Sequence, residues 1–193
     1  MTAPAHTRND EAGFSLIETM IAMTILATAL LSLAGVFIMG LTHLNGSSAS
    51  LIAREKAREA VESVHTARDN ESLSWCQIRN SNVAANCPNN ANGVFLPGVQ
   101  PMYLPGKDGL VNTADDATAG YEMSITPGID GILGTGDDKK VPMSNYTREI
   151  EITDVVLSGV TNPNLRQLKV TIGYTVGTLK RTYSLTTYIS AIS

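Results

Sequence analysis

Residues that build enzyme and metal sites are scarce in this chain. Its 193 residues include three histidines, two cysteines and one tryptophan, and the histidines lie far apart in the sequence, at His6, His43 and His65. Two thiols are too few to hold zinc by themselves. No serine or cysteine stands in a recognisable nucleophile motif, and no phosphate-binding glycine loop is present. We therefore expect a protein without enzymatic activity.

An excess of basic charge is also missing. The 14 lysines and arginines are outnumbered by 18 aspartates and glutamates, which gives a net charge of −4. This balance gives no indication of nucleic-acid binding. The length allows one membrane helix and one domain of modest size.

Charge is almost absent from one long stretch, residues 13–44, where Glu18 is the only acidic residue and His43 is the only other ionisable one. A helix needs roughly twenty apolar residues to cross a bilayer, whereas the apolar region of a signal peptide has roughly seven to fifteen. The stretch therefore predicts a transmembrane helix. An isolated carboxylate inside such a helix costs about 2.5–3.5 kcal/mol, so Glu18 needs a partner. Cleavage between Gly13 and Phe14 would supply one, because the new amine of Phe14 lies one helical turn away, and the amine of a neighbouring copy would serve equally well.

The sequence GFSLIE at residues 13–18 resembles the N-terminal signature of the type IV pilin and pseudopilin family. In that family a prepilin peptidase cuts after the glycine and methylates the new N-terminus. The resemblance implies that Gly13 is the cleavage residue, that Phe14 is methylated, and that Glu18 sets the register of packed helices during assembly. The alternative is a signal anchor that carries a glutamate by chance.

The expected fold is α+β and pilin-like. An apolar stripe follows the membrane segment at helical spacing, which predicts an amphipathic continuation that packs on a sheet. We expect a leader at 1–13, a membrane and assembly helix at 14–44, the amphipathic half of the same helix at 45–68, and a globular part at 69–193. The members of the stripe are Ala49, Ala53, Ala57, Ala60, Val64 and Ala67.

Two local features are expected, a weak point within the membrane helix and a disulfide beyond the helix. Members of the family commonly kink or melt the membrane half of the helix, and Gly35 and Gly40 could be the weak point here. Beyond the helix, Cys76 and Cys87 are expected to form a disulfide in an oxidising compartment, the alternative being two free thiols. Trp75, beside Cys76, is expected to be a local packing anchor in a loop region.

A twelve-residue unit occurs twice, at residues 105–116 and 127–138, with the shared form PGxDG, two apolar residues, then xTxDD. Carboxylates on glycine-rich turns are suitable ligands for calcium. Aspartate and glycine are also the ordinary residues of turns, so we expect purely structural turns and no required cofactor, with calcium binding as the alternative. The candidate calcium ligands are Asp108, Asp115, Asp116, Asp130, Asp137 and Asp138.

The last third alternates apolar and polar residues and predicts antiparallel strands around residues 121–125, 150–152, 168–176 and 179–189. We expect a meander with one apolar face for the helix. A turn is predicted at 162–164, where the sequence is Asn-Pro-Asn, and a tight hairpin at Gly177 and Thr178. The ending RTYSLTTYIS is similar to the C-termini of PilV-like minor pilins and related pseudopilins.

These features together predict a structural subunit of a type IV pilus or a similar filament, with a minor or priming role. The alternatives are a major pilin, a type II secretion pseudopilin, or a binding module for a surface or DNA displayed at a filament tip. The implied partners are other pilin subunits, prepilin peptidase, the inner-membrane assembly platform and the membrane itself. The implied location is the bacterial inner membrane for the precursor, then a periplasmic or extracellular filament.

Overall fold

The structure, a computed structural model, describes residues 15–83 and 92–191, apart from the side chains of residues 42, 43 and 45. The chain divides into two compact units, Met1–Leu44 and Asn45–Ser193. Helix α1 (Leu16–Asp69) contributes residues to both units. The second unit, called the head unit below, also contains every described strand.

The head unit is built around a four-stranded antiparallel sheet with the strand order β1-β4-β5-β6. A separate two-stranded antiparallel sheet joins β2 to β3. A 3-10 helix, η1 (Trp75–Gln77), and a short helix, α2 (Asp116–Ala119), lie in the loops. The strands are β1 (Gln100–Pro101), β2 (Met123–Thr126), β3 (Lys139–Pro142), β4 (Tyr146–Leu157), β5 (Val160–Val176) and β6 (Leu179–Ser190).

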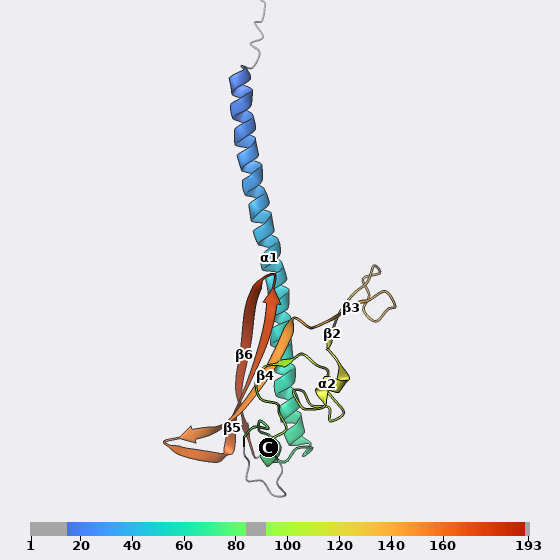
Figure 1. Cartoon of the computed structure of the whole chain (residues 1–193), viewed down its shortest axis with the longest axis vertical. Coiled ribbons are helices and arrows are strands. Elements are labelled where there is room, and N and C mark those ends of the chain that lie inside the picture. The colour runs from blue at the N-terminus through green and yellow to red at the C-terminus, as the bar shows by residue number, and fades with distance from the viewer. Residues whose placement is uncertain (1–14, 84–91, 192–193) are drawn as a thin grey trace, which may run out of the picture. The chain divides into compact units, whose positions relative to one another are not determined.

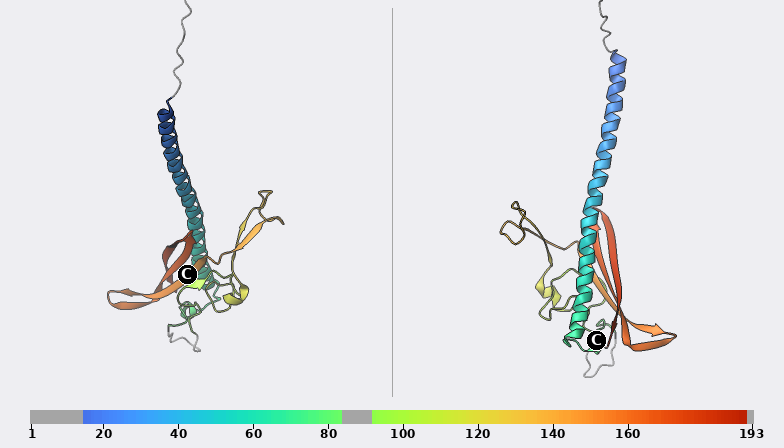
Figure 2. Two further views of the ribbon diagram at one scale, coloured as in Figure 1. Left: turned by 45° about the horizontal axis from the view of Figure 1, so that its top comes forward. Right: turned by 180° about the vertical axis from the view of Figure 1, so that it is seen from behind.

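The C-terminal part of α1 lies along one face of the four-stranded sheet (Figures 1 and 2). The alanine stripe forms the helix side of this contact, and Ala53, Ala57 and Ala60 have no exposed surface. Inward-facing residues of β4 and β5 complete the core, because alternate side chains of a strand share one face. The sheet side includes Ile150, Ile152, Leu168, Val170 and Ile172. The predicted α+β fold and the stripe are confirmed.

Strands β4 and β5 are joined at Ser158 and Gly159, and the predicted turn at residues 162–164 is wrong. Both Ser158 (φ 50°) and Gly159 (φ 82°) are left-handed, as a type I′ hairpin requires. Residues 162–164 lie inside β5, where the pairing with β4 jumps from Asn162 to Arg166. Pro163 is tolerated in this irregularity because it has no N–H to give to a ladder.

The second predicted hairpin is confirmed. Val176 of β5 pairs with Leu179 of β6, so Gly177 and Thr178 form a two-residue turn. Gly177 has a φ of 61°, and its lack of a side chain makes that conformation inexpensive.

The prediction of one continuous meander is wrong for the strand near residue 123. Strand β2 pairs with β3, for which the sequence pattern gave no prediction, and not with the main sheet. We call residues 123–142, which comprise β2, β3 and the loop between them, the arm. Glu122 holds its base to the head unit, since the Glu122 carboxylate accepts a hydrogen bond from Lys56 of α1 and the Glu122 N–H donates to Met102 O.

Candidate assembly helix and aspartate loops

The first unit contains one apolar stretch of α1, and the full helix is long and apolar enough to cross a membrane. Its large apolar side chains are exposed, from Leu16 (77 % exposed) to Leu44 (69 %). Glu18 stands in the first turn, where the N–H of Glu18 donates to Ser15 O at 3.0 Å. A carboxylate near a helix N-terminus interacts favourably with the unpaired backbone N–H groups there.

Four hydroxyl groups in this stretch bond backbone carbonyls of the same helix. Thr19 Oγ1 donates to Leu16 O, and Thr24 Oγ1 donates to Ile21 O, both at 2.8 Å. Thr28 and Ser32 make the same kind of bond one and two turns further on. Because a bilayer interior offers no water to bond, hydroxyls that bond their own backbone can be placed there at low cost. Thr19, Thr24 and Thr28 are therefore compatible with a membrane helix, because their hydroxyl groups bond backbone carbonyls of the same helix.

Comparison with known families places residues 8–34 in the family described as Prokaryotic N-terminal methylation motif. That match spans the predicted cleavage site, Glu18 and about the first two thirds of the apolar stretch. The chain carries the N-terminal motif of the type IV pilin and pseudopilin family. No curated protein and no solved structure matches the pilin-like chain significantly.

The structure places some of the predicted pilin residues and not others. Glu18, Gly35 and Gly40 all lie in α1. A weak point at these glycines was predicted for an assembled filament, so it stays a prediction. Gly13 and Phe14 lie outside the described residues, and so does Cys87; cleavage, methylation and the disulfide with Cys76 stay predictions as well.

The repeated unit forms two loops held by aspartate side chains. In the first aspartate loop (residues 105–116), Asp115 Oδ2 accepts hydrogen bonds from Lys107 N at 2.6 Å and Asp108 N at 3.4 Å. Asp115 Oδ1 accepts from Thr113 Oγ1 at 2.8 Å. Asp108 turns back on its own loop and accepts from Leu110 N at 2.9 Å. The carboxylates thus replace the backbone pairing that a turn of this length lacks.

The second aspartate loop (residues 127–138) repeats these bonds at the equivalent positions. Asp137 Oδ2 accepts from Ile129 N at 2.6 Å and from Asp130 N at 3.3 Å. Asp137 Oδ1 accepts from Thr135 Oγ1 at 2.6 Å, and Asp130 Oδ1 accepts from Ile132 N at 2.9 Å. In both loops the threonine hydroxyl lowers the pKa of the aspartate two residues on, Asp115 and Asp137. The sequence repeat is therefore a repeated structure.

The two glycines of PGxDG are needed for different physical reasons. A Cβ at Gly106 or Gly128 would overlap the carboxylate of Asp115 or Asp137, respectively, so the first glycine leaves room for that carboxylate. The second glycine is left-handed in both loops, with φ 71° at Gly109 and 70° at Gly131. Neither reason is visible from composition alone.

We expect Gly106→Ala to destabilise the head unit, because the new Cβ displaces the Asp115 carboxylate from its backbone partners. The matched control is Gly136→Ala, since a Cβ there meets nothing within 4 Å and the first loop has Ala114 at that position. Thermal unfolding of the purified chain should show a fall in melting temperature of about 3 °C or more for Gly106→Ala. An equal effect of the two substitutions would contradict this role of the carboxylate.

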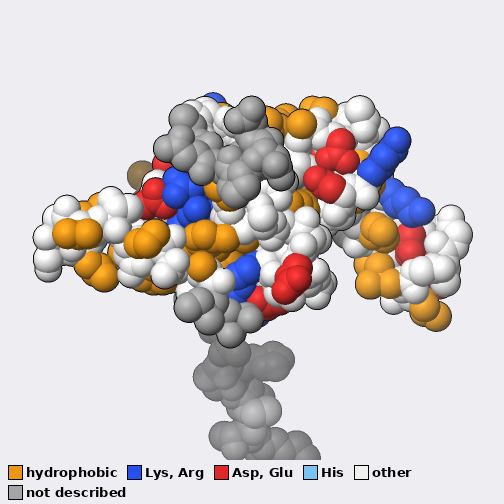
Figure 3. All heavy atoms as spheres, turned by 90° about the horizontal axis from the view of Figure 1, so that it is seen from below, with side chains coloured by type: hydrophobic (Ala, Val, Ile, Leu, Met, Phe, Trp, Pro, Cys, Tyr) orange, Lys and Arg blue, Asp and Glu red, His pale blue; other side chains and the backbone are white. Residues whose placement is uncertain are grey.

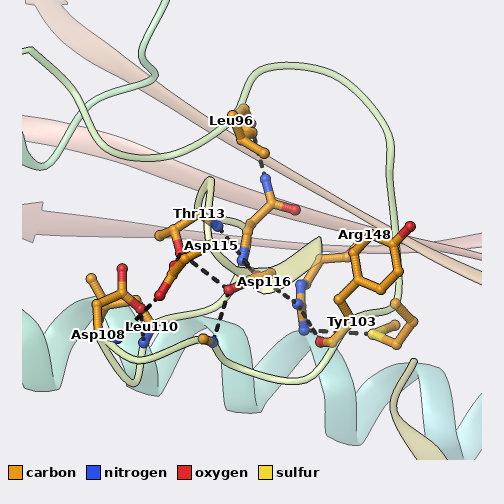
Figure 4. A network of polar contacts seen from close by, with 11 residues as sticks. Leu96, Tyr103, Asp108, Leu110, Thr113, Asp115, Asp116 and Arg148 are labelled. Carbon is orange, nitrogen blue, oxygen red and sulfur yellow. Dashed lines mark hydrogen bonds and ion pairs between the residues drawn. The ribbon is translucent and has the colours of Figure 1, made fainter. Parts of the chain in front are cut away.

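The first aspartate loop is docked on the head unit (Figure 4). Asp116 is 3 % exposed and accepts bonds from Asn112 N and Gly106 N, at 2.6 and 3.1 Å. Burial raises the pKa of the Asp116 carboxyl against these hydrogen bonds. Arg148 Nη2 of β4 lies 3.8 Å from Asp116 Oδ2 and donates to Tyr103 O at 3.2 Å. The acidic end of the loop thus lies beside the buried guanidinium of Arg148.

Calcium binding at these loops stays a prediction. One oxygen from each of Asp108, Asp115 and Asp116 can be chosen so that the three lie within 4.8 Å of one another. Each of these carboxylates already accepts hydrogen bonds from the loop, so its geometry is maintained without a cation. The interpretation as structural turns accounts for the observed bonds.

Two buried arginines were missed by the sequence analysis. Arg148 is 1 % exposed and Arg166 is 3 % exposed. Arg166 Nη1 donates to Trp75 O and to Ile78 O, the latter at 2.8 Å, and its guanidinium lies 4.1 Å from the centre of the Trp75 ring. Burial lowers the pKa of Arg166 to about 10. Trp75 also donates from Nε1 to Pro163 O at 2.8 Å, so its predicted role as a packing anchor is confirmed.

Proposed function

We propose that the protein is a structural subunit of a type IV pilus or a type IV pilus-like filament. The observation that carries this proposal is the methylation motif at residues 8–34. The motif overlaps the apolar part of α1, which has one acidic residue, Glu18, in its first turn. In this proposal the precursor is anchored in the inner membrane, prepilin peptidase cleaves it after Gly13, and Phe14 is methylated. The chain then enters a periplasmic or extracellular filament through the assembly platform.

Helix packing is the proposed mechanism of assembly. The amine of Phe14 pairs with Glu18 of a neighbouring copy, and this pair fixes the axial register between helices. An ion pair out of water is favourable only with good geometry, so a wrong register would leave two unpaired charges.

A minor or priming role is the finer part of the proposal, and the similarity of the C-terminal strand to PilV-like minor pilins supports it. The major-pilin and secretion-pseudopilin alternatives differ from it in abundance and in the machine that is served. Label-free mass spectrometry of sheared filaments distinguishes a minor subunit from a major pilin. A minor subunit is a small fraction of the filament protein, whereas a major pilin is most of it.

The mature N-terminus tests the proposal directly. Mass spectrometry of the chain purified from its natural host should find a first peptide that begins with methylated Phe14. The matched control is Gly13→Val, which should retain Met1 because the residue before the cut is no longer glycine. Recovery of the parent chain with Met1 in place would overturn the proposed pathway.

A further inference from the structure

The two aspartate loops have the same internal bonds but different surroundings. In the first loop the apolar pair Leu110 and Val111 is buried, 7 % and 2 % exposed. The equivalent pair in the second loop, Ile132 and Leu133, is 61 % and 60 % exposed. The chain thus contains a docked and an undocked form of one structural unit, and the docked form shows which kind of surface the unit packs on.

The first loop packs on an apolar surface that contains an arginine. Val111 belongs to the same buried hydrophobic cluster as Met102 and Ile150. Arg148 Nη2, from β4, lies 3.8 Å from Asp116 Oδ2, so the last carboxylate of the loop faces a guanidinium. A surface that receives this unit therefore supplies both apolar contact and a cationic side chain.

The second loop has a hollow at the corresponding position. Its volume is about 300 Å³, and it lies beside Asp138 as Arg148 lies beside Asp116. Residues 133, 134, 135 and 138 of its lining are the equivalents of 111, 112, 113 and 116 in the first loop. The lining combines apolar side chains with a carboxylate, and its members are Ile125, Leu133, Gly134, Thr135, Asp138 and Lys140.

Asp138 has an acceptor atom that its own loop does not satisfy. Asp138 Oδ2 accepts from Gly134 N at 2.6 Å, but Asp138 Oδ1 is buried and has no hydrogen-bond partner among the described residues. The equivalent atom of the first loop, Asp116 Oδ1, accepts from Gly106 N and Thr113 Oγ1, both at 3.1 Å. A buried acceptor without a donor is unfavourable. The undocked loop therefore has a place for a donor from outside it.

The charge of the second loop favours a cation as that donor. Residues 127–138 contain three aspartates and no lysine or arginine, which disfavours an anionic lipid surface. Lys140 also lines the hollow and is the charged group there that opposes a second cation. Apolar side chains of the arm lie beside acidic and basic ones (Figure 3). An arginine side chain has the apolar stem and the planar donor group that such a lining accommodates.

We propose that this hollow receives an arginine side chain of a different filament subunit. The inference rests on the proposed function, in which the neighbours of a minor subunit are other pilins. The guanidinium donates to the Asp138 carboxylate, and the stem of the arginine packs on Ile125 and Leu133. The contact repeats between two subunits what the first loop makes with Arg148 inside one head unit.

A photo-crosslinking amino acid at position 129 identifies the neighbour in cells that form filaments. Ile129 is fully exposed and does not line the hollow. We expect a product with a different pilin subunit, cross-linked in a region that contains an arginine. Asp138→Asn retains an acceptor for Gly134 N but removes the charge, and it should reduce this product at least about tenfold. The matched control is Asp130→Asn, which makes the same change in the same loop outside the hollow and should leave the product unchanged.

Substitution of the neighbour's arginine tests the pairing itself. Its replacement by glutamine should reduce the product by the same factor as Asp138→Asn. The two substitutions together should cause no further loss, because they remove one and the same interaction. Lys140→Gln should increase the product, since it removes the cation that opposes the arginine.

Each other outcome overturns a defined part of the proposal. A cross-link from position 129 to a second copy of this chain, to lipid or to no molecule overturns the contact if the filaments contain methylated Phe14. Losses that multiply in the combined variant, or a product that Asp138→Asn leaves unchanged, overturn the arginine pairing. Filaments without methylated Phe14 overturn the proposed function instead. The circular dichroism of the purified Asp138→Asn chain should equal that of the parent, and a changed spectrum would show that Asp138 acts on the fold, against the proposal.

Discussion

Glu18→Ala should nearly abolish entry of the chain into filaments while leaving its processing intact. The substitution makes membrane insertion easier, since it removes a carboxylate that costs about 2.5–3.5 kcal/mol in a membrane helix. It also removes the partner of the Phe14 amine between copies. Truncating one member of a buried charge pair costs about 2–5 kcal/mol, and 1.4 kcal/mol is about tenfold in an equilibrium constant. We therefore expect at least about thirtyfold less of the variant in sheared filaments.

Quantitative mass spectrometry of filament and membrane fractions measures this effect. The control is Glu55→Ala, which removes one exposed carboxylate from α1 beyond the apolar stretch and should leave assembly unchanged. The processed Glu18→Ala chain should still begin at methylated Phe14. If that variant is recovered from filaments in the amount of the parent chain, pairing at Glu18 does not set the register.

Arg166→Ala should cause a large loss of stability in the head unit. The substitution leaves the carbonyl groups of Trp75 and Ile78 without their donor and removes one partner of Asp154. It also removes the guanidinium from the Trp75 ring. Breaking a buried charged interaction on one side costs about 3–5 kcal/mol, partly because the remaining groups are left unpaired.

The matched control is Arg79→Ala, because Arg79 Nη2 bonds the same carboxylate, Asp154 Oδ1, at 2.7 Å but has a side chain that is 20 % exposed. A partly exposed pair contributes up to about 1 kcal/mol. Urea unfolding of the purified chain, followed by circular dichroism, should therefore separate the two variants by at least about 2 kcal/mol. Similar losses in the two variants would show that the Arg166 bonds to the backbone contribute little.

The sequence was informative where a pattern repeats at regular spacing. The alanine stripe predicted the packed face of α1, and alternation predicted β5 and β6. The same alternation could have found the arginines, since Arg148 is two residues before Ile150 and Arg166 two before Leu168, on the inward face. A charged residue at an inward position is an indication of a buried polar network.

Other features could not be predicted, because the sequence offers more than one possibility for each and does not show which is favoured. Asn-Pro-Asn and Ser-Gly are both turn sequences, and the longer pairing of β4 with β5 requires the turn at Ser158. The sequence predicted structural turns at the aspartate loops, with calcium as the alternative, but it did not show which backbone N–H groups and threonine hydroxyls the carboxylates bond. Which copy of the repeat is docked depends on Arg148 and the core around it, which are distant in sequence.

The alanine stripe has one more consequence, for the thermodynamics of docking the helix on the sheet. Leucine or isoleucine loses about 0.5–1 kcal/mol of rotamer freedom on burial, whereas alanine loses none. Ala53, Ala57 and Ala60 therefore join the core without a side-chain entropy penalty.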